Sequence, residues 1–348
     1  MSRYLNILKI LQNKELSHDE ILASLKEEGI KISRASLNRD LLELRKQNLV
    51  STTGKARASK YKLSKAYQLI HEINPQEYFY KEFNERKIIS NFKPEIIEQV
   101  LESQEKVFTE DELARLQEAN QQYKANRKLL GQTLIKKNLE IFTIDFAWKS
   151  SKIEGNTYTL LETETLLKTQ RTAAGKTKDE AIMLLNHKAA IDYILEQAEL
   201  FQTISSSKVS VLHEILTKEL NVKAGIRTNP VRIGGTNYKP LDNQFQIQEA
   251  LEASCVAINQ IDNIFCKALA TMALIAYLQA YEDGNKRTSR TLTNAILLAH
   301  NYCPLSYRNI DEAEYKKALL IFYEQNNLSY LKQIFIEQFI FAVETYWA

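Results

Sequence analysis

The sequence predicts a mainly α-helical protein made of a small basic part and a larger acidic part. Only 9 glycines and 5 prolines occur among 348 residues, and 44% of the residues are hydrophobic, which favours helices with packed cores over sheet sandwiches. Residues 1–65 carry 14 Lys and Arg against 7 Asp and Glu, while the net charge of the whole chain is only +3. A basic segment on an acidic body indicates a separate partner for that segment, with nucleic acid the usual candidate. The length is typical of about two domains.

Composition also limits the compartment and the partners. The three cysteines, Cys255, Cys266 and Cys303, lack the spacing of a metal site, so we expect reduced thiols in a cytoplasmic protein. No apolar run approaches the ~20 residues that span a bilayer. The first residues open an amphipathic helix without the apolar core of a signal peptide. We therefore expect no membrane partner.

Residues 1–65 are predicted to form three short helices followed by a two-stranded hairpin. Ser17 and Glu20 form a capping box, which begins the second helix, and Ser33 can cap the third. Two short strands then flank a basic turn that contains Gly54.

Three short helices before a basic hairpin resemble the winged helix-turn-helix family. The resemblance implies that the third helix enters the major groove of DNA and that the wing contacts phosphates. A protein-docking or dimerisation module stays open as the alternative, but the charge asymmetry favours DNA. The residues that the resemblance assigns to DNA are Arg34, Asn38, Arg39, Lys55 and Arg57.

Residues 66–148 are predicted to be a helical connection that leads into the larger part of the chain. Pro94 can begin a helix, and Thr109 with Glu112 forms a second capping box before a long polar helix. A further helix is expected from Leu134 to Ile153. The residues of this region indicate no chemistry of their own.

The end of that helix carries Ser150 and Glu154, which are four residues apart and therefore share one face. Gly155 and Asn156 are natural residues for ending a helix. Because the helix dipole disfavours a carboxylate at a C-terminus, we expect a cationic partner for Glu154, and Arg290 is a candidate. A surface glutamate beside an ordinary cap is the alternative.

Two further helices, at 178–201 and 208–220, carry His187 and His213. We expect structural roles for both, with His187 packed at the surface, because no second His or Cys has ligand spacing.

Residues 229–240 are predicted to form a hairpin, since two apolar residues alternate with polar ones before a Gly-Gly turn. An exposed hairpin could hold an extended target segment by strand addition. A β-like connection between helices is the alternative. The residues concerned are Val231, Arg232, Ile233, Gly234 and Gly235.

The stretch from Gln279 to Arg290 joins an apolar helix to a second helix that begins near Arg287. A carboxylate beside basic groups and backbone amides at a helix start is how proteins hold a metal-bound phosphate. A polar loop with a charged helix cap is the alternative. The residues that form this pattern are Asp283, Gly284, Asn285, Lys286, Arg287 and Arg290.

In this order, the segments 150–156, 229–240 and 279–290 resemble the Fic family, over about residues 90–340. The family motif is His, any residue, Phe, any residue, Asp or Glu, Gly-Asn-Gly-Arg, two of any kind, then Arg. The resemblance implies a Fic-type helical bundle over 149–348, with a small β-hairpin flap that binds the target and an inhibitory motif at 150–156. Typical members transfer AMP from ATP to a hydroxyl group of a target protein.

The resemblance also implies a role for each matching residue. Asp283 would bind Mg²⁺, and Gly284, Asn285, Lys286 and Arg287 would hold phosphate. Arg290 would hold the terminal phosphate, unless Glu154, in the motif that begins at Ser150, pairs with it and blocks that position. A partner, oligomerisation or target engagement would lift the block. The identity of the target protein and a homo-oligomeric state stay open.

Two positions depart from the family motif. Gln279 replaces the histidine that acts as general base, and an amide cannot take a proton; losing a general base typically costs ~10²–10⁴ in rate. Lys286 replaces a glycine and resembles the Doc branch, whose members phosphorylate their target. We favour an adenylyltransferase that Glu154 inhibits and that has weakened or altered catalysis. A non-catalytic nucleotide-sensing winged-helix regulator and a Doc-like protein kinase are the alternatives.

Overall fold

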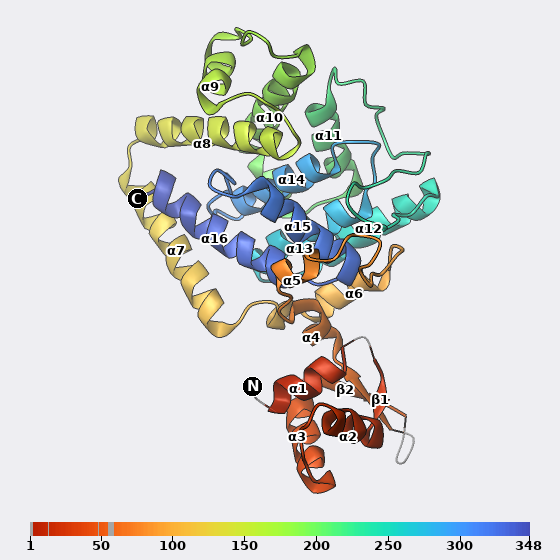
Figure 1. Ribbon diagram of the computed structural model, residues 1–348. Coiled ribbons are helices and arrows are strands. Elements are labelled where there is room, and N and C mark those ends of the chain that lie inside the picture. Colours follow the sequence, from red (N-terminus) through yellow and green to blue (C-terminus); the bar gives the residue numbers. More distant parts are fainter. Residues whose placement is uncertain (1–2, 13, 48, 55–58) are drawn as a thin grey trace. The chain divides into compact units, whose positions relative to one another are not determined.

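The computed structural model describes residues 3–12, 14–47, 49–54 and 59–348, and it divides into two compact units, Met1–His71 and Glu72–Ala348 (Figure 1). The boundary predicted from the sequence is residue 65, whereas the first unit of the structure ends at residue 71. No helix in these described ranges is long and apolar enough to cross a membrane.

The first unit has the three helices and the hairpin that the sequence predicts. The N-terminal capping box of the second helix is present, because Ser17 Oγ accepts from the Glu20 amide and a Glu20 carboxylate oxygen accepts from the Ser17 amide. The strands form an antiparallel sheet in the order β1-β3-β2, with Leu16 opposite Tyr61. The short first strand is not predicted from the sequence. The elements are α1 (Arg3–Ile10), β1 (Leu16–Ser17), α2 (His18–Glu27), α3 (Arg34–Lys46), β2 (Val50–Thr53), β3 (Lys60–Leu63) and α4 (Lys65–Ile70).

The second unit is helical, as predicted. The capping box of Thr109 and Glu112 begins its first long helix. A helix that the sequence analysis missed, α9, begins with another capping box, formed by Thr159 and Glu162. The helices are α5 (Pro75–Phe79), α6 (Glu95–Glu102), α7 (Glu110–Leu129), α8 (Gln132–Ile153), α9 (Leu160–Thr169), α10 (Lys178–Glu196), α11 (Ser206–Thr217), α12 (Gln244–Gln260), α13 (Ile264–Leu278), α14 (Asn285–Ala299), α15 (Glu312–Gln325) and α16 (Ser329–Tyr346).

Helices α13 and α14 form the centre of this unit (Figure 1). Every residue from Phe265 to Ala280 is buried, and so is every residue from Arg287 to Leu297. A helix such as α13, which is apolar on almost all sides, has to be enclosed by other elements, and α14 is enclosed although many of its buried side chains are polar. The short loop between α13 and α14 is therefore held by two helices that have little freedom to move.

The predicted hairpin at 229–240 is wrong: this segment is a loop without paired strands, with a turn at Gly234-Gly235. Its second arm bonds to a different part of the chain, since the Lys239 amide donates to Ser90 O and Lys239 O accepts from the Phe92 amide. Pro230 in the first arm also lacks an amide hydrogen for a strand pair. We call residues 229–240 the flap loop.

Candidate functional site

The loop between α13 and α14 has two residues in left-handed conformations. Gln279 has φ 50° and ends α13, and Gly284 has φ 82° and precedes α14. A Cβ atom on Gly284 would lie 2.9 Å from the Thr217 methyl carbon and 3.4 Å from the His213 ring, so only glycine fits without displacing α11. Gly284 has no side chain to cap the first amides of α14, and no other side chain in the described ranges caps them. This helix start can therefore bind an anion.

A cavity of about 200 Å³ lies at this helix start. Three segments far apart in the sequence line it: the end of α8 with Glu154, the flap loop from Val231 to Gly234, and the α13–α14 loop. Tyr323 of α15 also lines it, and no sequence signal indicated that residue. Small-molecule pockets usually measure about 300–1,000 Å³, so this cavity is small for a nucleotide as it stands.

The Glu154 carboxylate fills one side of the cavity and contacts two cations. Its Oε1 lies 2.9 Å from Arg290 Nη2, and its Oε2 lies 2.7 Å from Lys286 Nζ. Burial by itself would raise the pKa of Glu154, but the charges of Arg290 and Lys286 outweigh it and lower the pKa to about 2. The partner that the helix-dipole argument predicts is thus in place, whereas the contact with Lys286 was not predicted.

Ser150 links the same arginine to α10. Arg290 Nε donates to Ser150 Oγ at 2.9 Å, and His187 Nε2 lies 2.8 Å from that hydroxyl oxygen. His187 Nδ1 faces the Met183 carbonyl, which can only accept, so Nδ1 carries the hydrogen and Nε2 accepts from Ser150. The predicted surface position of His187 is wrong: the ring is fully buried between α8 and α10, and burial lowers its pKa to about 3.

The Gln279 side chain is engaged within the loop. Its Nε2 donates to Ala276 O at 2.7 Å, which caps the end of α13, and its Oε1 accepts from Asn285 Nδ2 at 3.3 Å. Asn285 also bonds both backbone groups of Tyr281, at 2.9 Å and 2.8 Å. Gln279, which the family resemblance places in the general-base position, therefore serves as a helix cap, and Asn285 fixes the shape of the loop.

Asp283 is the carboxylate to which the family resemblance assigns Mg²⁺. Its side chain is 70% exposed, and one oxygen lies 2.8 Å from Arg287 Nη2. The described residues contain no group of three His, Cys, Asp or Glu side chains that could hold a metal by themselves. Magnesium is commonly held by one or two carboxylates together with substrate phosphates, and a single exposed carboxylate beside an anion site fits that requirement.

His213 supports the same loop from α11. Its ring stacks on Tyr281 at 3.7 Å between centroids, and its Nε2 donates to Asp283 O at 2.9 Å. Burial lowers the pKa of His213, so the ring is neutral. The structural role expected for this histidine agrees with these contacts.

The candidate DNA-binding residues on α3 lie on its outer face. Arg34, Asn38 and Arg39 are exposed, whereas Leu37 and Leu41 on the inner face are buried. Arg34 also forms an ion pair with Asp19. The other two candidates, Lys55 and Arg57, lie outside the described residues.

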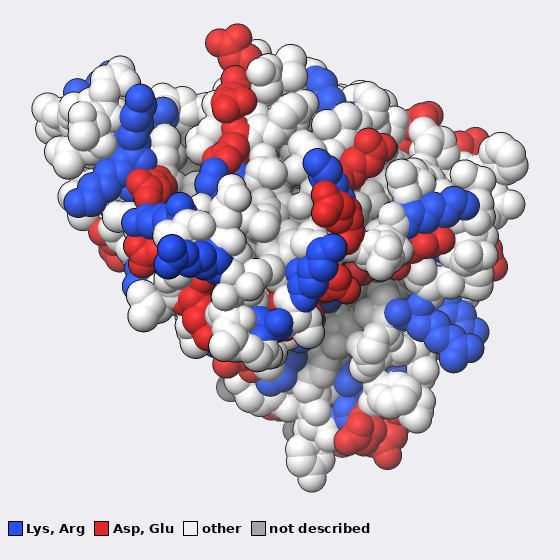
Figure 2. All heavy atoms as spheres, turned by 90° about the horizontal axis from the view of Figure 1, so that it is seen from above, with Lys and Arg blue, Asp and Glu red and all other residues white. Residues whose placement is uncertain are grey.

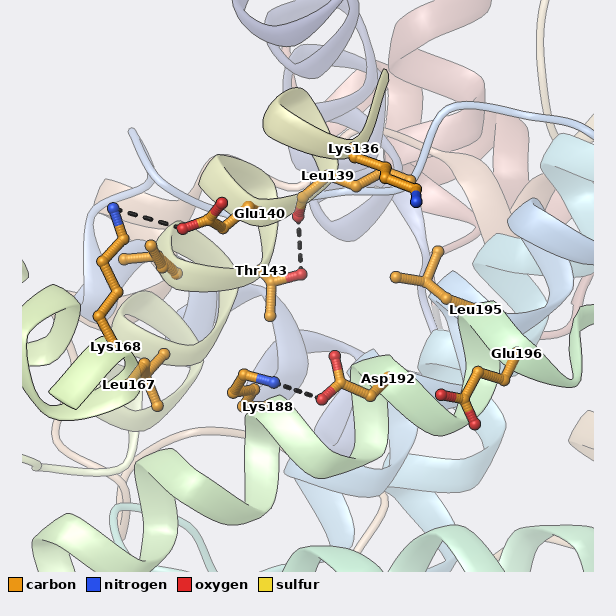
Figure 3. A pocket seen from close by; sticks show the side chains of 11 residues that line it. Lys136, Leu139, Glu140, Thr143, Leu167, Lys168, Lys188, Asp192, Leu195 and Glu196 are labelled. Carbon is orange, nitrogen blue, oxygen red and sulfur yellow. Dashed lines mark hydrogen bonds and ion pairs between the residues drawn. The ribbon is translucent and has the colours of Figure 1, made fainter. Parts of the chain in front are cut away.

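A larger cavity of about 600 Å³ lies between α8, α9 and α10 (Figure 3). Four of its charged side chains form two pairs, since Lys168 reaches Glu140 at 3.3 Å and Lys188 reaches Asp192 at 2.5 Å. None of the residues in the segments 150–156, 229–240 or 279–290 lines it. On the side of the molecular surface that Figure 2 shows, basic and acidic side chains are also mixed. The cavity at α14 remains the candidate site.

Comparison with known proteins gives two family matches. Residues 203–297 match the Fic/DOC family, and residues 1–68 match the arginine repressor DNA-binding domain. The first match contains the flap loop and the α13–α14 loop but not Glu154.

Named relatives align with less than half of this chain. The chain is 30% identical over 178 residues to the protein adenylyltransferase Fic of Drosophila mojavensis, which covers 48% of this chain and 34% of the relative. It is 29% identical over 164 residues to the protein of the same name in Drosophila melanogaster, which covers 45% and 33%. The chain thus spans about a third of the length of these curated relatives.

Solved structures show the shared fold. Fic-1 from C. elegans matches with a TM-score of 0.56 at 17% identity, over 67% of this chain and 70% of that one. A Fic-domain-containing signalling protein from Bacteroides thetaiotaomicron matches with a TM-score of 0.55 at 19% identity, over 67% and 96%.

Proposed function

Because this chain contains a Fic/DOC-family domain, we propose that it transfers AMP from ATP to a hydroxyl group of a target protein and that Glu154 inhibits the transfer. The observation that carries the proposal is the Glu154 carboxylate, which Arg290 and Lys286 hold inside the cavity at the start of α14. A terminal phosphate would need the same two cations. The carboxylate and the phosphate therefore compete, and an inhibitory contact implies an activity to inhibit.

The remaining residues have roles in nucleotide binding under this proposal. The uncapped amides of α14 and the guanidinium of Arg287 would bind phosphate oxygens. Asp283 would hold Mg²⁺, which neutralises phosphate charge when bound. The target hydroxyl oxygen would form a bond to the α-phosphorus while the bond to pyrophosphate breaks. Since Gln279 cannot accept the hydroxyl proton, that proton would leave to water or to a phosphate oxygen.

Labelling with ATP tests the proposal. The wild type, Glu154→Gly, Gln279→His and the double variant are each incubated with α-labelled and with γ-labelled ATP, and protein-bound label is measured. Label from α-labelled ATP in Glu154→Gly is the expected result, with the double variant about 10²–10⁴-fold faster. Arg171→Gln, which removes an exposed charge on the 170–177 loop, is the matched control and should behave as the wild type does. Label that appears only after histidine is restored would contradict activity in the natural sequence.

A nucleotide-sensing regulator is the second candidate. The observation that favours it is the Gln279 amide, whose two ends bond Ala276 O and Asn285. ATP binding by the wild type without label in any form of the assay would support this candidate. A DNA affinity that changes with ATP would support it further.

A Doc-like kinase rests on Lys286 alone. Under that alternative, protein-bound label would come from γ-labelled ATP and not from α-labelled ATP. The labelling experiment therefore separates all three functions. A cytoplasmic location is part of the proposal, supported by three buried free cysteines.

A further inference from the structure

Arg227 carries a buried positive charge that forms no ion pair within the described residues, although the nearby charge of Asp242 partly offsets the effect of burial on its pKa. Its side chain lies just before the flap loop and is 1% exposed, and no ion pair in the described ranges includes it. Burial lowers the pKa of Arg227, which expresses the cost of removing the guanidinium from water. A buried charge without a counter-ion is retained only where hydrogen bonds offset that cost.

Those hydrogen bonds go to three carbonyl groups. Arg227 Nε donates to Gln279 O at 2.7 Å, Nη1 donates to Asn229 O at 2.8 Å, and Nη2 donates to Leu241 O. The Arg227 amide also donates to Ala280 O at 3.1 Å. Asn229 is the first residue of the flap loop, and Leu241 directly follows its last residue. A single planar guanidinium thus joins both ends of the flap loop to the first residue of the α13–α14 loop.

The acceptors at the end of α13 explain why a cation is placed there. The last carbonyls of a helix have no partner within the helix, and they carry the negative end of its dipole. Gln279 Nε2 donates to Ala276 O, Tyr238 Oη donates to Tyr277 O at 3.1 Å, and Arg227 Nε donates to Gln279 O. Of these donors, Tyr238 belongs to the flap loop, and Arg227 lies two residues before it. Tyr238 and Arg227 therefore connect the flap loop to the end of α13, where Gln279 lies.

We propose that Arg227 is a positioning residue that sets the distance between a target segment on the flap loop and the nucleotide site. This inference rests on the proposed transfer of AMP. The attacking oxygen has to lie about 3–3.5 Å from the phosphorus, and a displacement of about 1 Å can cost about 10²-fold in rate. Because Arg227 holds the flap loop and Gln279 together, its loss would separate target from nucleotide without removing any group that binds ATP.

The test uses the full-length Glu154→Gly/Gln279→His protein as the parent, in which labelling is expected to be fastest. Arg227→Gln, Arg227→Lys and the charge control Arg171→Gln are added to it. Three quantities are measured: the rate of labelling from α-labelled ATP, the Kd for ATP, and amide hydrogen exchange over residues 228–241. Thermal unfolding confirms that each variant is folded.

Arg227→Gln should lower the labelling rate about 10²-fold while the Kd for ATP stays within about threefold of the parent value. Exchange over 228–241 should rise. Arg227→Lys should label about tenfold faster than Arg227→Gln but more slowly than the parent, since an ammonium reaches fewer of the carbonyls. Arg171→Gln should match the parent in all three quantities.

The proposal is overturned if Arg227→Gln labels at the parent rate with unchanged exchange, or if its affinity for ATP falls as far as its rate. If the parent itself takes no label, AMP transfer fails and hydrogen exchange decides the role of Arg227. Increased exchange over 228–241 at unchanged ATP affinity would still support positioning, and unchanged exchange would refute it.

Discussion

At the scale of single residues, the charges and the limited space at the start of α14 restrict how the side chains there can be arranged. Glu154 could have remained a solvent-exposed carboxylate, but two cations on α14 hold both of its oxygens. Gln279 keeps the left-handed backbone that ends α13 and uses its amide as a cap. Under the proposed inhibition, the site stays closed until something displaces Glu154.

Acidification should not open the site. The Glu154 carboxyl has a pKa of about 2, so it stays ionised above that value and loses its contacts only as the pH falls through it. Glu154→Gln should bind ATP about 10- to 150-fold more tightly than the wild type, equivalent to about 1.5–3 kcal/mol for hydrogen bonds to charged groups. That ratio should be constant from pH 8 to pH 5 in calorimetric titrations. A ratio that falls toward one at pH 5 would refute the assigned ionisation.

Gly284 provides a steric prediction. Gly284→Ala should lower the free energy of unfolding by about 1–3 kcal/mol, because of the positive φ and the contact with the Thr217 methyl group. Thr217→Ser removes that methyl group and keeps the hydroxyl that bonds His213 O. The double variant should therefore lose less stability than the two single variants predict together. Additive losses in urea titrations would show that the methyl contact does not limit this position.

At the scale of elements, the ends of helices decide what reaches the site. Helix α8 presents Ser150 and Glu154 to α14, and the flap loop covers the other side of the cavity. The flap loop is held at its base by Arg227 and near its turn by Arg86, whose Nη2 donates to Gly235 O. A loop held at these points can position a target segment without being a strand.

The packing of α8 on α10 predicts a pH dependence of stability. His187 has a pKa of about 3 when folded, against an ordinary value of 6.5, so the unfolded chain takes up a proton first as the pH falls. The stability that the neutral ring provides is complete above pH 6.5 and is lost progressively toward pH 3. The difference in unfolding free energy between the wild type and His187→Gln should shrink by about 2 kcal/mol from pH 7 to pH 5.

Urea unfolding at the two pH values measures that difference. His18→Gln in the first unit serves as the control, because it changes a histidine away from the α8–α10 contact. A difference between wild type and His187→Gln that stays constant would show that folding does not lower the pKa of His187.

At the scale of the whole molecule, a domain that matches a DNA-binding family precedes the Fic/DOC-family domain. The match over residues 1–68 agrees with the winged helix-turn-helix predicted from the helices and the basic hairpin. Its core is separate, formed by residues from Ile7 to Leu63. The DNA-binding match falls in the first unit and the Fic/DOC match in the second.

DNA binding gives the prediction at this scale. Arg39 is exposed on α3 and, among the described residues, contacts only Ser36 weakly at 3.5 Å, so it is available to a phosphate or a base. Arg39→Gln should weaken DNA binding and lower the slope of log affinity against log salt by about 1 if it contacts a phosphate. Arg171→Gln on the larger unit should change neither the affinity nor the slope. Equal affinity of the wild type and Arg39→Gln at every salt concentration would remove α3 from the interface.

The sequence by itself determined the features that depend on neighbours within a few residues. Capping boxes at Ser17 and Thr109 and the helical spacing of apolar residues predicted these helices, whereas α14 begins at Asn285, two residues before the predicted start near Arg287. The same capping signal at Thr159 was present and would have revealed α9. The helix dipole was enough to predict that Glu154 needs a cation.

The tertiary structure decided the features that depend on distant segments. Glu154 and Arg290 are 136 residues apart, and only the packing of α8 on α14 brings Lys286 to the second oxygen of Glu154. The flap loop has a strand-like pattern, but Lys239 bonds the segment near Ser90 and Arg227 occupies the end of α13. Local pattern cannot show which partner a backbone group will find, because hydrogen bonds and buried charges are satisfied by whatever the folded chain brings near.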